Sequence, residues 1–180
     1  MQETMKMQTA TKSYFRFAAM IATSMLVMLG LMYLNTYTFS HIQWSETRAY
    51  MTVLMGASMA IVMLAFMWNM YKRKGVNWGI VIGSLMAFSA ALYLVRSQMS
   101  VQDDSWMKAM IPHHSIAILT SERAEISDVR VRDLADSIIE AQRREIKVMN
   151  WLLEDIEQNG EVTDDQTAQL RAVPEFDAQL

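Results

Sequence analysis

Two adjacent histidines are the residues of this chain whose type and spacing point most directly to chemistry. His113 and His114 stand in the run WMKAMIPHHSIAIL, and the whole sequence of 180 residues holds only three histidines. On a helix, which turns about 100° per residue, Met107, Met110 and His114 share one face, and Met110 precedes both histidines by about one turn. One thioether can therefore approach either imidazole, which is a donor set suited to a soft metal ion.

A second helix is expected to lie opposite this motif. The apolar residues of 128–158 repeat every three or four positions, which predicts a helix with one buried face. If it forms an antiparallel hairpin with residues 106–124 that turns near Ile126, residues 139 and 140 face the histidines. Gln142 and Met149 then share the face that approaches Met110, with Glu145 beside it. The predicted metal ligands are Met107, Met110, His113, His114, Gln142 and Met149.

These donor types favour one class of metal. Thioether and imidazole groups suit Cu(I), with Cu(II) bound through the histidines, whereas calcium and magnesium require clustered carboxylates. The chain has no cysteine, and the H-E-x-x-H motif of hydrolytic zinc sites is absent. A di-iron site in a bundle would need Glu-x-x-His pairs, but Met110 stands three residues before His113. The motif therefore predicts a copper site, and the alternative is a histidine pair that only packs within a helical core.

No catalytic constellation accompanies the motif. A nucleophile, a base and an orienting group do not occur together in a recognisable pattern, so we expect the protein not to be an enzyme. The second half of the chain, residues 97–180, carries eight basic and seventeen acidic residues, a net charge of −9. Such a domain suits cations and excludes nucleic acid as a partner, because phosphates require a basic face.

The elements before the motif are of another kind. Residues 15–34, 49–71 and 76–95 are three apolar segments of about the length that crosses a bilayer, and charged residues are confined to their edges. We therefore expect an all-α protein with three transmembrane helices in residues 1–96 and a helical hairpin or bundle in residues 97–180.

The loop charges predict an orientation. Basic residues precede the first span and fill the loop at Lys72–Lys74, which joins the second span to the third, whereas the loop 37–48 has one arginine and one glutamate. The positive-inside rule then places the N-terminus in the cytoplasm. The C-terminal domain is expected to face the periplasm or the cell exterior, with the spans in the cytoplasmic membrane.

The outer domain has clear helix signals. Asp103, Asp104 or Ser105 is expected to cap its first helix, Asp128 caps the second, and Gly160 ends it. A short third helix is expected within residues 163–171. Two long helices are too few to enclose a core, so we expect a homodimer that completes a four-helix bundle, or docking of the hairpin onto its own spans.

The sequence also resembles a known family. The elements MIPHH and Q-x-x-E-I-x-x-M, with the flanking "SIAILTSERAEI" and "DLADSIIEAQ", are similar to the domain of unknown function 305, and the membrane half resembles a three-span subgroup of that family. The resemblance implies a ferritin-like helical domain with a copper link. It implies that the site involves Met110, His113, His114, Gln142, Glu145 and Met149.

The spans carry a stripe of methionines. Met51, Met55, Met59, Met63 and Met67 recur every four residues, so they wind slowly around one helix. Such a stripe is typical of helix packing, and the alternative is a thioether path for Cu(I). The third histidine, in the loop after the first span, is expected to be an interfacial residue.

These features lead to one leading hypothesis and one rival. The first is a membrane-anchored protein that holds copper outside the cytoplasmic membrane, for tolerance or for hand-over to a periplasmic copper carrier. The second is a structural or protein-interaction module without metal.

The predicted topology can be tested with reporter fusions. Alkaline phosphatase fused after Gly160 should be active, because this enzyme folds only outside the cytoplasm, whereas a fusion within Lys72–Gly75 should be inactive. An inactive reporter at Gly160, from a fusion that is expressed at normal level, would reverse the orientation.

Overall fold

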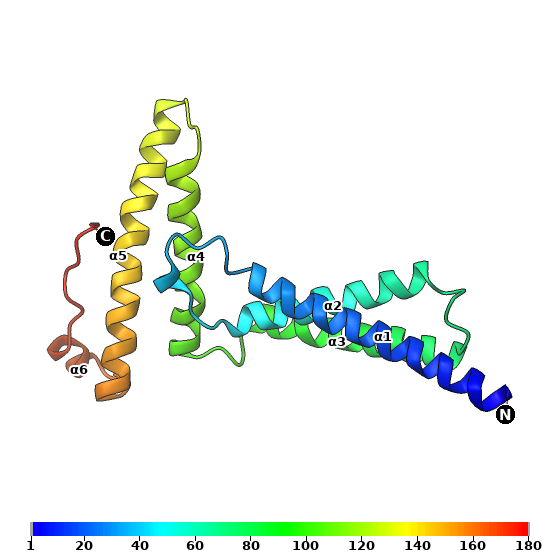
Figure 1. Cartoon of the computed structure of the whole chain (residues 1–180). Helices are drawn as coiled ribbons and strands as arrows, with labels where there is room; N and C mark the ends of the chain where they lie inside the picture. The colour runs from blue at the N-terminus through cyan, green and yellow to red at the C-terminus, as the bar shows by residue number, and fades with distance from the viewer. Residues whose placement is uncertain (1, 180) are drawn as a thin grey trace. The chain divides into compact units, whose positions relative to one another are not determined.

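The computed structural model is entirely helical over the residues it describes, which are 2–179 for the backbone and 11–179 for side chains. No strand occurs within that range, and the predicted all-α class with three long apolar helices before a helical domain is confirmed. Figure 1 shows the elements in chain order. They are α1 (Gln2–Leu31), the 3-10 turn η1 (Phe39–His41), α2 (Glu46–Phe66), α3 (Lys74–Ser97), α4 (Asp103–Arg123), α5 (Val129–Asn159) and α6 (Asp165–Leu170).

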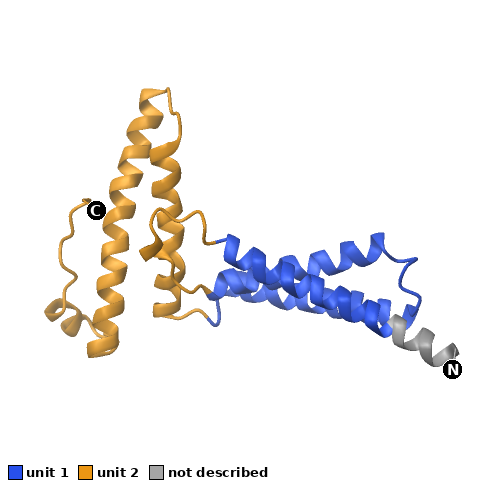
Figure 2. Ribbon diagram, in the orientation of Figure 1, with its two compact units in different colours: residues 1–32, 46–100 blue, residues 33–45, 101–180 orange. Residues whose placement is uncertain are grey.

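The chain divides into two compact units (Figure 2). One consists of the chain up to Met32 together with Glu46–Ser100, and it contains the three apolar helices. The other consists of Val101 onward together with Tyr33–Ser45, the loop between the first two apolar helices. That loop, which we name the inter-span segment, therefore belongs structurally with the C-terminal helices, although its position in the sequence lies between two spans.

The first unit has three helices that can cross a membrane. Thr11–Leu31, Glu46–Phe66 and Lys74–Ser97 are long and apolar enough by length and composition. Helix α2 packs against both α1 and α3. Gly56 of α2 accepts the side chain of Met25 from α1, which lies where a Cβ atom would stand. A small residue therefore lets these two helices approach closely.

The methionine stripe of α2 lies partly inside this unit. Met59, Met63 and Met67 pack against the buried side chains of Phe17 and Leu64, and Met51 is exposed. Thioether side chains fill irregular gaps between helices well. Their position favours the packing interpretation of the stripe.

The buried side-chain amide of Asn77 links two elements at one end of the first unit. Asn77 is fully buried, and its Nδ2 donates to the carbonyl oxygen of Tyr71 at 3.0 Å. The hydroxyl of Tyr14 donates to Asn77 Oδ1 at 2.7 Å and accepts from the backbone N–H of Arg73 at 3.1 Å. Because buried polar groups are costly when unpaired, this network ties α1 to the loop between α2 and α3.

The second unit is built on an antiparallel hairpin of α4 and α5. Its core is a cluster of buried apolar side chains from both helices, against which Tyr37 of the inter-span segment also packs. The buried members are Met107, Ile111, Ile118, Ile139, Ile146 and Met149. The α4–α5 hairpin therefore shares its core with the inter-span segment.

The expected ends of α5 are confirmed, but the expected cap of α4 is wrong. Helix α4 begins at Asp103 with Gln102 as its cap, so Asp103 and Asp104 lie within the first turn, where negative charge is favourable. Asp128 caps α5 by accepting from the N–H of Arg130 at 2.9 Å. The short helix α6 lies within the range expected for a third helix.

Gly160 ends α5 in a conformation that glycine alone adopts readily. Residues with a Cβ atom do not readily adopt its φ of 78° and ψ of 171°. These angles also differ from those of the left-handed helical region, which asparagine tolerates. Arg171 holds the segment that follows Gly160 against the end of α5. Its guanidinium pairs with Asp155 and donates to the carbonyl oxygen of Gly160 at 3.0 Å. The polypeptide therefore reverses at this residue.

The change Gly160→Ala should destabilise the end of α5 by about 1–3 kcal/mol, because the Cβ atom forces strain at this φ and ψ. Hydrogen exchange of the α5 amides in the full chain would measure it as faster local opening. Gly75→Ala is the matched control, since Gly75 lies in a helix with open space around it and should change stability by less than about 0.5 kcal/mol. Equal exchange in the two variants would contradict this account.

Candidate functional site

The two histidines have different environments on α4. His114 is buried, with 9% of its surface exposed, whereas His113 is exposed. Neighbouring residues on a helix point about 100° apart, so only one of the two can face α5. Their ring centroids are 6.0 Å apart. The pair therefore combines one fixed imidazole with one that solvent reaches.

Both ring nitrogens of His114 have a partner. Nδ1 lies 2.9 Å from the carbonyl oxygen of Met110, and a carbonyl only accepts, so Nδ1 carries a hydrogen. Nε2 lies 2.7 Å from Oε2 of Glu145. With the hydrogen on Nδ1, Nε2 is the ring nitrogen whose lone pair can bind a metal ion.

Glu145 reaches His114 from α5 and is itself oriented. The amide Nε2 of Gln142 donates to Glu145 Oε2 at 3.1 Å. Gln142 therefore positions the carboxylate in this structure, while its predicted role as a ligand stays a prediction. Helical periodicity predicts Glu145 beside the site, although it is not one of the six predicted ligands.

The expected register does not bring Glu145 against His114. A turn near Ile126 places residues 139 and 140 opposite the histidine pair, whereas the observed partner of His114 is Glu145. Residues 124–128 between the helices are partly extended, since Ala124 and Asp128 have extended backbones, so the helices do not pair symmetrically about Ile126. The long side chain of Glu145 also reaches around α5 from an exposed position.

The predicted thioether ligands differ in burial. Met107 and Met149 lie within the hydrophobic core with 4% and 5% of their surfaces exposed, and Met110 is partly buried at its edge. Of these three, Met110 is the least enclosed, and its carbonyl oxygen holds His114. The structure thus joins His114, Glu145 and Gln142 by hydrogen bonds, with His113 and Met110 next to them in the helix.

Pro112 does not interrupt this arrangement. It is fully buried within α4, which runs as one helix from Asp103 to Arg123. Proline lacks the N–H that would bond the carbonyl oxygen of Lys108. The turn just before the histidines therefore has one fewer backbone bond than a regular helix.

The third histidine lies against the residue that follows the pair. Ser115 is fully buried, and its Oγ accepts from the backbone N–H of Tyr37 at 2.6 Å and lies 3.0 Å from Nδ1 of His41. His41, expected to be interfacial, is instead buried with 7% exposure. Burial lowers the pKa of His41, because the charged ring loses its hydration.

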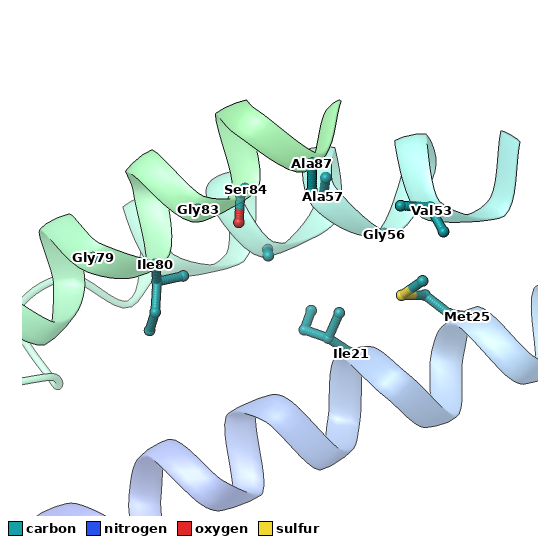
Figure 3. A pocket seen from close by; sticks show the side chains of 11 residues that line it. Ile21, Met25, Val53, Gly56, Ala57, Gly79, Ile80, Gly83, Ser84 and Ala87 are labelled. Carbon is teal, nitrogen blue, oxygen red and sulfur yellow. The ribbon is translucent and has the colours of Figure 1, made fainter. Parts of the chain in front are cut away.

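The first unit has a separate groove (Figure 3). It has a volume of about 380 Å³ and lies along α1, α2 and α3, with Ile21 and Met25 pointing into it from α1. Its other lining residues are apolar or small, apart from Ser84. This lining offers little to bind an ion, so the groove does not compete with the histidine pair as a candidate site.

Comparison with known proteins identifies the family. The sequence pattern of the family described as "Domain of unknown function (DUF305)" matches residues 94–178, which include α4, α5 and α6. An uncharacterized protein of Acanthamoeba polyphaga mimivirus is 31% identical over 108 residues, which cover 59% of this chain and 69% of that protein. The chain belongs to the DUF305 family. No solved structure matches it.

Within the DUF305 match lie all the predicted ligands and Glu145. The match does not contain His41, which precedes it in the sequence. The buried contact of His41 with Ser115 is therefore a feature that this chain adds from outside its DUF305 region.

The depressed pKa of His41 predicts a pH dependence. The unfolded chain takes up a proton near pH 6.5, whereas the folded chain resists it, so stability should fall as the pH drops below about 6.5. The unfolding midpoint of the full chain in mild detergent should be lower at about pH 5.5 than at about pH 7.5. In His41→Gln, whose amide retains a hydrogen bond to Ser115, the drop should be smaller.

Asp104 and Asp177 do not contribute to this pH dependence. The pKa values of Asp104 and Asp177 are lowered by hydrogen bonds to Lys108 and Lys147, so both stay ionised over that pH range. An equal drop in the His41→Gln variant would show that another group is responsible.

Proposed function

We propose that this protein is a membrane-anchored copper-binding protein that holds Cu(I) outside the cytoplasmic membrane, for tolerance or hand-over. The observation that carries the proposal is the arrangement of His114. Its Nδ1–H is held by a backbone carbonyl and its Nε2 faces Glu145, so the nitrogen that can bind a metal is oriented in advance. The neighbouring ring of His113 is accessible from solvent.

The donor set supports copper over other metals. Among the described residues, no three His, Cys, Asp or Glu side chains gather into a metal-binding group. A complete site would therefore draw on a thioether, and Met110 is the nearest in the helix to both imidazoles. Imidazole with thioether is a soft donor set, which favours Cu(I). Glu145 faces the same nitrogen, so its carboxylate would move aside for a bound ion or would itself join the ligands.

The anchor is supported by three apolar helices, and the orientation by the loop charges. In this proposal the acidic second half of the chain lies in the periplasm or outside the cell, where it attracts cations before they reach the site. Binding and release, rather than catalysis, would be its activity, and a soluble periplasmic copper carrier would be its partner.

A protein-interaction module is the second candidate. The tip of the hairpin exposes Val129, Val131 and Leu134, with 72%, 48% and 59% of their surfaces accessible. The other apolar positions of the α5 face are covered or partly covered within the chain. A homodimer therefore remains a proposal, with the hairpin tip as the surface that favours it.

Copper binding is tested by titrating the full chain in mild detergent with Cu(I) against a chromogenic chelator. The double change His113→Ala with His114→Ala should weaken binding more than any single methionine change. Met110→Leu should weaken it more than Met107→Leu or Met149→Leu, because those two side chains are enclosed in the core. Glu145→Gln should weaken it, because the neutral amide no longer places a negative charge beside the bound ion.

The matched control is His41→Gln, which removes the third histidine but leaves these residues unchanged. It should retain the affinity of the original chain. Binding no tighter than micromolar in the original chain would reject the copper proposal, and full affinity in the double variant would place the site elsewhere.

A further inference from the structure

We propose that the outer face of the inter-span segment, Tyr33–Ser45, rests in the lipid headgroup region and so holds the paired-histidine helix beside the bilayer surface. The proposal rests on the membrane anchoring of the proposed function, but not on copper binding. It assigns a lipid surface as the partner of side chains that no other contact explains.

The segment has two faces of different character. On its inner face Tyr37 packs against the core of the second unit, and His41 and Ser45 are buried, with Ser45 1% exposed. On its outer face Phe39 is 87% exposed and Trp44 is 60% exposed. Leu34 and Ile42 are exposed as well. A segment of thirteen residues that exposes four large apolar side chains is unusual for a surface that meets only water.

Its composition is that of a membrane interface. The sequence YLNTYTFSHIQWS contains no Asp, Glu, Lys or Arg, and burial lowers the pKa of its one histidine. Four of its thirteen residues are aromatic. Tyrosine and tryptophan are enriched where lipid headgroups meet water, because one end of each side chain is apolar and the other polar.

Covalent connection brings the segment to the membrane. The spans Thr11–Leu31 and Glu46–Phe66 each have 21 residues, which as helices measure about 31 Å, close to the thickness of the hydrocarbon core. Leu31 and Glu46 therefore mark the edge of that core. Trp44 is two residues from Glu46, so its Cα lies within about 7 Å of the end of the span. The headgroup layer is about that deep.

The inner face connects this surface to the candidate site. Tyr37 N–H donates to Ser115 Oγ at 2.6 Å, and His41 Nδ1 lies 3.0 Å from the same oxygen. Ser115 directly follows His114. One face of the segment then lies in the headgroup layer, and the other face contacts Ser115. The distance between the histidines and the membrane surface is therefore about the thickness of the segment.

Site-directed spin labelling can test the lipid contact, because the chain has no cysteine of its own. Single variants Phe39→Cys and Leu170→Cys are matched, since the two residues are 87% and 82% exposed and neither substitution disturbs a core. Leu85→Cys, at a 52% exposed position of α3, serves as the label inside the spans. The labelled full chain is placed in nanodiscs of phosphatidylcholine and phosphatidylglycerol without copper. Collision with oxygen reports lipid, and collision with a nickel chelate reports water.

The label at residue 39 should show an oxygen-to-nickel accessibility ratio several-fold higher than the label at residue 170, and below or equal to that at residue 85. A ratio at 39 equal to that at 170, with a lipid-type ratio at 85, would overturn the lipid contact and leave the anchor intact. Low access of both reagents to residue 39 would also overturn it, because a second copy or another protein would then cover the segment. A water-type ratio at 85 would reject the membrane anchor of the proposed function itself.

Discussion

The burial of one imidazole between two helices is the constraint around which the second unit is organised. His114 lies on the face of α4 that contacts α5, and a buried polar ring must have partners for both nitrogens. The carbonyl oxygen of Met110 provides one partner and Glu145 provides the other. Glu145 is held in turn by Gln142, so His114 is joined to one turn of α5. Ile111 and Ile146 pack in the core that the two helices share.

A second set of contacts joins the α4–α5 hairpin to the inter-span segment. Ser115 is adjacent to His114, and its fully buried hydroxyl is held by Tyr37 and His41 from the inter-span segment. The hairpin therefore depends on residues that lie before α2 in the sequence. This explains why the second unit includes Tyr33–Ser45, and why a fragment that starts near residue 97 would lack part of its own core.

Local features of the fold could be predicted from the sequence because their causes are local. The cap at Asp128 and the end of α5 at Gly160 depend on a few neighbouring residues, and the three apolar helices depend on composition. The hairpin register could not be predicted, since it depends on the conformation of residues 124–128 and on the reach of Glu145. The burial of His41 depends on contact with Ser115 across 74 positions of sequence, and its flanking residues carry no signal for that. The paired histidines were recognised, but their unequal exposure follows from tertiary packing.

That unequal exposure has a chemical consequence for adjacent histidines. A buried imidazole with both nitrogens engaged is oriented but cannot leave its place, whereas an exposed imidazole can rotate and meet an incoming ion. A metal ion that enters through His113 would reach Nε2 of His114 only if Glu145 Oε2, which lies 2.7 Å from that nitrogen, moved aside or joined the ligands. The nearby carboxylate of Glu145 would then offset part of the charge of the bound ion. Release toward a partner would reverse the same steps. Two identical side chains at neighbouring positions can thus have different roles, one in retention and one in transfer.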